Sequence, residues 1–131
     1  MAVESIVGMT MFAVKRIDEK IVMYCEDGRI YTLLHEQDCC ESVVIDDICG
    51  DLSDLEGSPL LVCEESSNVD DSGKYESATW TFYRFATVKG WVTLKWHGSS
   101  NGYYSESVDL VVDQKSTQEW RDVRLEKLGI E

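Results

Sequence analysis

The feature that most constrains the fold is a two-residue alternation through residues 79–96. Threonine and aromatic side chains alternate with a second set of aromatic and charged side chains up to Arg84, and residues 91–96 repeat the pattern after a Lys89-Gly90 turn. Successive side chains of a strand point to opposite faces, so this period indicates β-structure. The segment therefore predicts a long antiparallel hairpin with aromatic contacts across its strands.

Short runs of strand-forming residues continue this pattern along the chain. Asp27-Gly28 separates two of them, and Asp-Gly is a strong hairpin signal. The only proline, Pro59, leaves long stretches free to pair. Residues 64–76 and 98–102 are polar and are predicted to be loops. Strands are predicted at residues 9–16, 21–25, 30–35, 42–45, 60–63 and 103–112.

Two segments favour helix. Residues 51–57 predict one or two turns with Asp51 as N-cap and Gly57 as the stop. Residues 116–119 match a capping box with Ser116 as N-cap, and a helix is predicted from there to Gly129. We therefore expect an α+β protein: a β-rich, twisted, mainly antiparallel sheet with one short helix and a C-terminal helix.

The 131 residues predict a single domain over residues 1–131. No apolar run approaches the ~18 residues that span a bilayer, so no membrane association is expected. The first residues lack a basic segment followed by an apolar one, so no signal peptide is predicted, and the cytoplasm is the expected compartment. An odd number of cysteines there argues against a disulfide framework. Cys25, Cys49 and Cys63 are predicted to be buried among apolar neighbours.

Negative charge is concentrated in the middle of the chain. The net charge is −13, and residues 36–76 hold thirteen acids against one base, Lys74. Such a block repels phosphates, which argues against direct nucleic-acid binding. It attracts a basic protein surface and speeds association at low salt, although an acidic face can also serve only solubility. The predicted partner-binding residues are Asp46, Asp47, Asp54, Glu56, Glu64, Glu65, Asp70 and Asp71.

Residues 35–41 and 100–106 are two dense polar clusters beside predicted strands. They offer an alternative, ligand-binding site, in which one of two adjacent tyrosines could stack on a base. Phosphate-binding glycine motifs are missing, and no cofactor is expected. The residues of this alternative site are His35, Asp38, Cys40, Asn101, Tyr104 and Glu106.

Two catalytic readings of the same residues stay open. Cys40, His97 and Asn101 supply the residue types of a Cys-His-Asn relay, but no oxyanion or nucleophile-elbow signature accompanies them. His35, Cys39, Cys40 and Glu41 could contribute to a metal site, with His97 as the second imidazole, yet adjacent cysteines lack the paired spacing that zinc sites use. The acids around Asp51 do not match a calcium loop. The sequence therefore favours a protein that is not an enzyme and holds no metal.

Four segments carry a family resemblance: HEQDCCESV from His35, GDLSDLEGSP from Gly50, TWTFY from Thr79 and SNGYYSESV from Ser100. In this order, over roughly residues 20–112, they resemble a small uncharacterised family of bacteriophage and bacterial domains. The resemblance implies a phage or prophage setting and no particular activity. It also suggests that the clusters of His35 and Tyr103 meet in space.

Three functions follow as hypotheses. The first is a non-enzymatic, phage-encoded inhibitor of a host defence complex, similar to anti-CRISPR proteins, whose carboxylates imitate phosphates in the basic channel of a host protein such as a nuclease. The second is a sponge for a small nucleotide signal. The third is a cysteine- or metal-dependent hydrolase. Exposed sheet edges also predict a homodimer.

Overall fold

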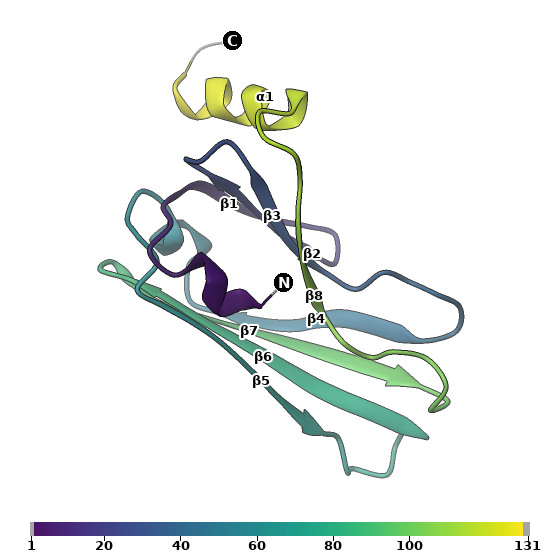
Figure 1. Ribbon diagram of the computed structural model, residues 1–131. Coiled ribbons are helices and arrows are strands. Elements are labelled where there is room, and N and C mark those ends of the chain that lie inside the picture. The colour runs from purple at the N-terminus through teal and green to yellow at the C-terminus, as the bar shows by residue number, and fades with distance from the viewer. Residues whose placement is uncertain (1, 130–131) are drawn as a thin grey trace.

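Eight strands form two antiparallel sheets in the computed structural model, which describes residues 2–129. The first sheet has the order β1-β2-β3-β8 and the second the order β4-β7-β6-β5. The β-rich fold class is confirmed, but the strands divide between two packed sheets (Figure 1). The strand bounds are β1 Met11–Ile17, β2 Lys20–Cys25, β3 Ile30–Leu34, β4 Ser42–Cys49, β5 Val62–Val69, β6 Ser77–Thr87, β7 Gly90–Ser100 and β8 Asp109–Val112.

The long hairpin predicted from the alternation is β6 and β7. These strands pair in register from Ser77 opposite Ser100 to Thr87 opposite Gly90. Thr81, Tyr83 and Phe85 point inward and are buried, whereas the side chains between them lie on the outer face. Asp27-Gly28 also forms the predicted turn, with Gly28 at a φ of 93° that suits glycine.

One apolar core fills the space between the sheets. It includes Met23 and Leu33 from the first sheet and Phe85, Leu94 and Trp96 from the second, all at most 1% exposed. Two short 3-10 segments, η1 (Val3–Ile6) and η2 (Leu52–Leu55), add Ile6 and Leu55 to this core. The helix predicted at residues 51–57 is thus a single 3-10 turn, which the Asp51 carboxylate caps at the N–H of Ser53.

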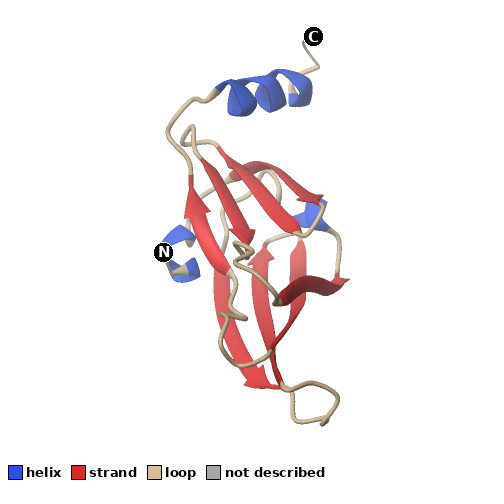
Figure 2. Cartoon of the chain, turned by 90° about the vertical axis from the view of Figure 1, so that its right-hand side faces the viewer, coloured by secondary structure: helices blue, strands red, loops and turns tan. Residues whose placement is uncertain are grey.

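The C-terminal helix α1 (Gln118–Lys127) packs across one end of the outer face of the first sheet (Figures 1 and 2). Trp120 packs edge-on against Phe12 at 5.5 Å and donates its indole N–H to the carbonyl of Cys25. The N-cap is Thr117, one residue after the predicted Ser116, because Ser116 takes a φ of 55°. Gly129, at a φ of 75°, follows the helix as predicted.

The largest differences from the predicted strand limits concern four strands. Residues 64–69 are strand β5 and not loop, because each pairs with a residue of β6. Strand β4 continues past Ile45 to Cys49, and β7 continues through Ser99 and Ser100. Residues 103–108 are irregular, so only Asp109–Val112 of the predicted last strand pair with β3. No helix in the described residues is long and apolar enough to cross a membrane.

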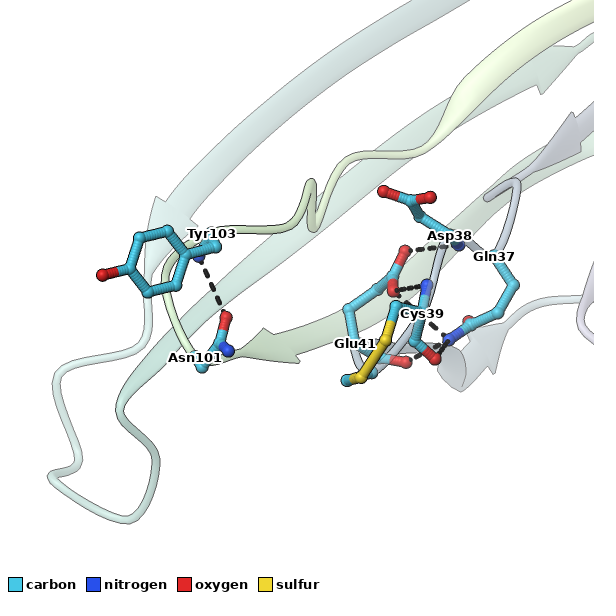
Figure 3. Close-up of a disulfide and its surroundings, with 7 residues drawn as sticks. Gln37, Asp38, Cys39, Glu41, Asn101 and Tyr103 are labelled. Carbon is cyan, nitrogen blue, oxygen red and sulfur yellow. Dashed lines mark hydrogen bonds between the residues drawn. A yellow bond between two sulfur atoms is a disulfide. The ribbon is translucent and has the colours of Figure 1, made fainter.

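Two of the three cysteines predicted to be buried are so. Burial raises the pKa of the Cys25 thiol to about 11 and that of Cys63 to about 12. Cys49 is exposed, contrary to the prediction, because it lies on the edge strand β4. Cys39 and Cys40 form a disulfide within the loop between β3 and β4 (Figure 3).

Candidate functional site

No helix of residues 2–129 lies over the outer face of the second sheet (Figure 1). This face carries several aromatic side chains. Trp91 on β7 is 52% exposed, and Tyr75 in the β5–β6 loop is 49% exposed. Trp80 and Phe82 on β6 are half-buried between them. A tryptophan that is half in water on an open sheet face is the type of side chain that anchors protein partners.

Each of two cations on this face lies between a ring and a carboxylate. Arg84 lies 4.8 Å from the ring centroid of Trp91 and 3.5 Å from a carboxylate oxygen of Glu64. Lys95 lies 4.3 Å from the centroid of Trp80, and its Nζ is 3.6 Å from an oxygen of Asp46. These exposed pairs contribute little to stability. They hold the rings and carboxylates of the face in a defined arrangement.

A buried histidine–aspartate pair closes one end of the face. His97 Nε2 is 2.8 Å from Asp70 Oδ2, and the side chains are 11% and 8% exposed. The ring also contacts Trp80 and Tyr75, at centroid distances of 4.3 and 4.9 Å. The backbone N–H of Ser72 and the His97 imidazole hold the pKa of the Asp70 carboxyl below its usual range. Asp70 therefore ties the β5–β6 loop to β7.

The eight predicted partner-binding carboxylates do not form one patch. Asp46, Asp47, Glu64 and Asp71 are exposed on or next to the outer face. Asp70 belongs to the buried pair with His97. Half of the predicted set is therefore accessible at this face.

The remaining three carboxylates serve other contacts. Glu65 lies on the opposite face of the sheet, where its carboxylate accepts a hydrogen bond from the hydroxyl of Tyr83. Glu56 accepts the N–H of Val14 at 2.8 Å and pairs with Lys127 at 2.9 Å. Asp54 is half-buried in η2. Their positions make Glu56 and Asp54 parts of the scaffold.

The two polar clusters adjoin, as the resemblance suggested, because Cys40 lines a pocket together with Ser100 and Asn101. The first cluster also contacts Ser107, the residue after the second cluster. His35 Nδ1 is 2.7 Å from the carbonyl oxygen of Ser107, and its Nε2 is 2.7 Å from Glu41 Oε2. The Glu41 side chain has no exposed surface and accepts the N–H groups of Asp38 and Cys39, each at 2.9 Å (Figure 3). This carboxylate holds the β3–β4 loop closed and, through His35, joins it to the segment before β8.

The pKa of Glu41 gives a testable pH dependence. The N–H of Cys39 makes the largest contribution to lowering that pKa, from its ordinary 4.5 to about 2. A carboxyl whose pKa is depressed by folding stabilises the fold above its unfolded pKa, and that stability is lost as the pH falls through the folded pKa. Glu41→Gln should therefore lower the melting temperature at neutral pH, and the difference from the unaltered chain should shrink between about pH 4.5 and about pH 2.

Thermal melts across this pH range test the assignment. The matched control is Glu36→Gln, an exposed glutamate of the same loop, which should leave the melting temperature unchanged. A Glu41→Gln loss that stays constant down to the acid limit would contradict the ionised, hydrogen-bonded role of Glu41.

The six residues of the alternative ligand site are divided among three places. His35 is hydrogen-bonded to Glu41. The side chain of Asp38 is exposed, and its backbone N–H donates to the same Glu41 carboxylate. Cys40 and Asn101 line a shallow pocket of about 290 Å³. Tyr104 and Glu106 line a larger pocket of about 520 Å³ on the other side of the second sheet. The six side chains therefore do not converge on one ligand.

The catalytic readings find little support in the geometry. The Cys40 sulfur is bonded to Cys39, so it is not available as a thiolate nucleophile or ligand. His97 is held by Asp70 and does not share a pocket with Cys40. Within residues 2–129 no group of three or more His, Cys, Asp or Glu side chains is arranged to hold a metal ion.

The sequence indicated Glu41 only as a possible metal ligand and placed Glu65 in a loop among the partner-binding acids. The structural role of Glu41 is shown by its burial, which the sequence did not indicate. Glu65 was read as part of a loop, although the alternation of residues 62–69 opposite β6 turns it inward with Tyr83. If residues 62–69 had been predicted as a strand, their two-residue period would have placed Glu65 on the same face as Cys63, toward the core.

Comparison with known proteins places most of the chain in a family. The model of a domain of unknown function, DUF7448, matches residues 4–110. The match extends the expected limits of the resemblance at the N-terminal side and excludes the helix α1. Neither the curated proteins nor the solved structures gave a match.

Proposed function

Because this chain belongs to DUF7448, a family described only as a domain of unknown function, we propose its function from its geometry: it is a non-enzymatic binding protein that docks a basic protein through the outer face of the second sheet. The observation that carries the proposal is the uncovered aromatic face, with the half-exposed Trp91 near the β6–β7 turn and exposed carboxylates on the same face. Aromatic anchors supply affinity, and charged rims supply partner selection and association rate.

The preferred partner is a nucleic-acid-binding host protein, such as a nuclease of a defence complex. The net charge of −13 steers the chain toward a basic channel. Once there, the carboxylates around the aromatic face compete with phosphates for the same lysine and arginine side chains. The protein then acts in the host cytoplasm as a phage- or prophage-encoded inhibitor, similar to anti-CRISPR proteins.

Charge neutralisation tests the rim of the face. Asp46→Asn, Asp47→Asn, Glu64→Gln and Asp71→Asn together leave Asp70 and Glu56 intact, so the fold is kept. We expect the variant to inhibit DNA or RNA binding by the partner about tenfold less well at low salt, with a flatter salt dependence. The matched control neutralises four exposed acids elsewhere, Glu4, Asp18, Asp113 and Asp122.

Trp91→Ala tests the anchor. Trp91 is half exposed, so its removal should change the free energy of unfolding little while weakening partner binding by about 2 kcal/mol, mainly through faster dissociation. The partner is first obtained by affinity capture from a prophage-bearing host, and both variants are then compared by surface plasmon resonance. Equal affinities for the unaltered chain, the rim variant and Trp91→Ala would rule out this face. Self-association in sedimentation experiments would instead identify a second copy as the occupant.

A further inference from the structure

The pocket of about 520 Å³ lies on the inner face of the second sheet, away from the proposed docking face. Strands β5 and β6 form its floor, and residues 102–109 form its opposite wall. At this end the inner face is polar, because Ser67 and Thr79 stand where Cys63 and Phe85 fill the core at the other end. A core made of serine and threonine gains little from burial, so this part of the face stays open to water.

The lining combines hydroxyls with three carboxylates, those of Glu65, Glu106 and Asp109, and the lining residues include no lysine or arginine. Hydroxyls of Thr79 and Ser100 donate to Glu106, and that of Tyr83 donates to Glu65. Burial raises the pKa of the Glu106 carboxyl, but hydrogen bonds from Ser100, Ser77 and Thr79 outweigh it and hold that pKa below its usual range. Glu106 is therefore ionised at neutral pH.

These anions retain acceptor capacity. An ionised carboxylate offers about four lone-pair sites, and the hydroxyls of Thr79, Ser100 and Ser77 do not use all of them at Glu106. Asp109 is exposed at the start of β8 and lines the same pocket. Three acceptor groups around one cavity repel one another unless a cation lies between them. Ammonium groups match such a lining, because each presents three donors and a positive charge.

We propose that this pocket binds a small organic polyamine, a molecule with two or more primary ammonium groups. The volume lies within the range of small-molecule sites, about 300–1,000 Å³. The half-buried Tyr104 adds an aromatic face that a cation can approach. Nucleotides, the ligand class of the sponge hypothesis, would meet only repulsion from the same carboxylates. The pocket is separate from the docking face, so an experiment can contradict the polyamine proposal without contradicting the docking proposal, and the reverse.

Isothermal titration calorimetry of the purified chain with spermidine and, separately, with glucosamine tests the proposal. Spermidine should bind. Glucosamine carries a single ammonium group and should bind more weakly, and N-acetylglucosamine, which lacks the charge, should not bind. Absence of spermidine binding at millimolar concentration, or equal binding of glucosamine, would overturn the proposal.

Three variants localise the binding. Glu65→Gln with Asp109→Asn should weaken it about tenfold or more, because two of the three anions are lost. Ser67→Phe keeps the charge but fills the cavity and should abolish binding. The control Asp18→Asn with Asp122→Asn makes the same change in net charge away from the pocket and should bind as the unaltered chain does. Equal weakening in the control would show unspecific attraction and overturn the site.

Discussion

Trp96→Ala should be the most destabilising single substitution of the second sheet, with a loss of about 3–5 kcal/mol in the free energy of unfolding. Trp96 has no exposed surface and packs in the core between the sheets, opposite Thr81 and Ile45 on the neighbouring strands. Its removal leaves a cavity that rigid strands on both sides cannot close. Urea denaturation followed by tyrosine fluorescence and circular dichroism measures the loss.

Trp96→Phe separates packing from hydrogen bonding. The indole Nε1 of Trp96 has no partner among the described residues, although it is buried. An unsatisfied buried donor costs about 1–3 kcal/mol, so removing it offsets part of the lost volume. We expect Trp96→Phe to lose less than half as much stability as Trp96→Ala. Equal losses in the two variants would show that the N–H is bonded, for example to a buried water.

Gly98→Ala should destabilise the fold by about 1–3 kcal/mol and displace the wall of the inner pocket. A Cβ at Gly98 would lie 2.6 Å from the carbonyl oxygen and 2.9 Å from the Cβ of Glu106. Backbone must therefore move, and Glu106 would lose its hydroxyl donors on β6 and β7. Amide hydrogen exchange should quicken at residues 104–108, and spermidine binding should weaken with it.

Gly73→Ala is the matched control for Gly98→Ala. Gly73 lies in the exposed β5–β6 loop, where a Cβ meets nothing within 4 Å, but its φ is 81°. It should cost about 1 kcal/mol or less, from backbone strain alone, with no change in exchange at residues 104–108. If Gly98→Ala behaves like Gly73→Ala, the segment before β8 is not held against the sheet.

The hairpin β6–β7 and the helix α1 could be predicted because their signals are local. The hairpin shows a two-residue period over residues 79–96, and the helix follows a capping pattern before Gln118. Each pattern involves only residues that are close together in the chain. Strand β5 was missed beyond Cys63 for the opposite reason. Its residues 64–69 are polar, and only their pairing with β6 makes them a strand.

The candidate sites divide in the same way. Composition along the chain indicated an acidic middle block, and four of its carboxylates do border the outer face. The burial of Glu41, the pairing of Asp70 with His97 and the inward turn of Glu65 depend on side chains that are distant along the chain. Charge counts treat all of these acids alike.

The sequence by itself determined the β-rich class, the main hairpin, the terminal helix and the excess of negative charge, since periodicity and composition act over neighbouring residues. Only the tertiary structure decided that the strands form two sheets, that the outer face of one stays open, and which carboxylates face solvent. The physical reason is that strand pairing and burial join residues far apart in the chain, and no local pattern encodes which of several similar strands will meet.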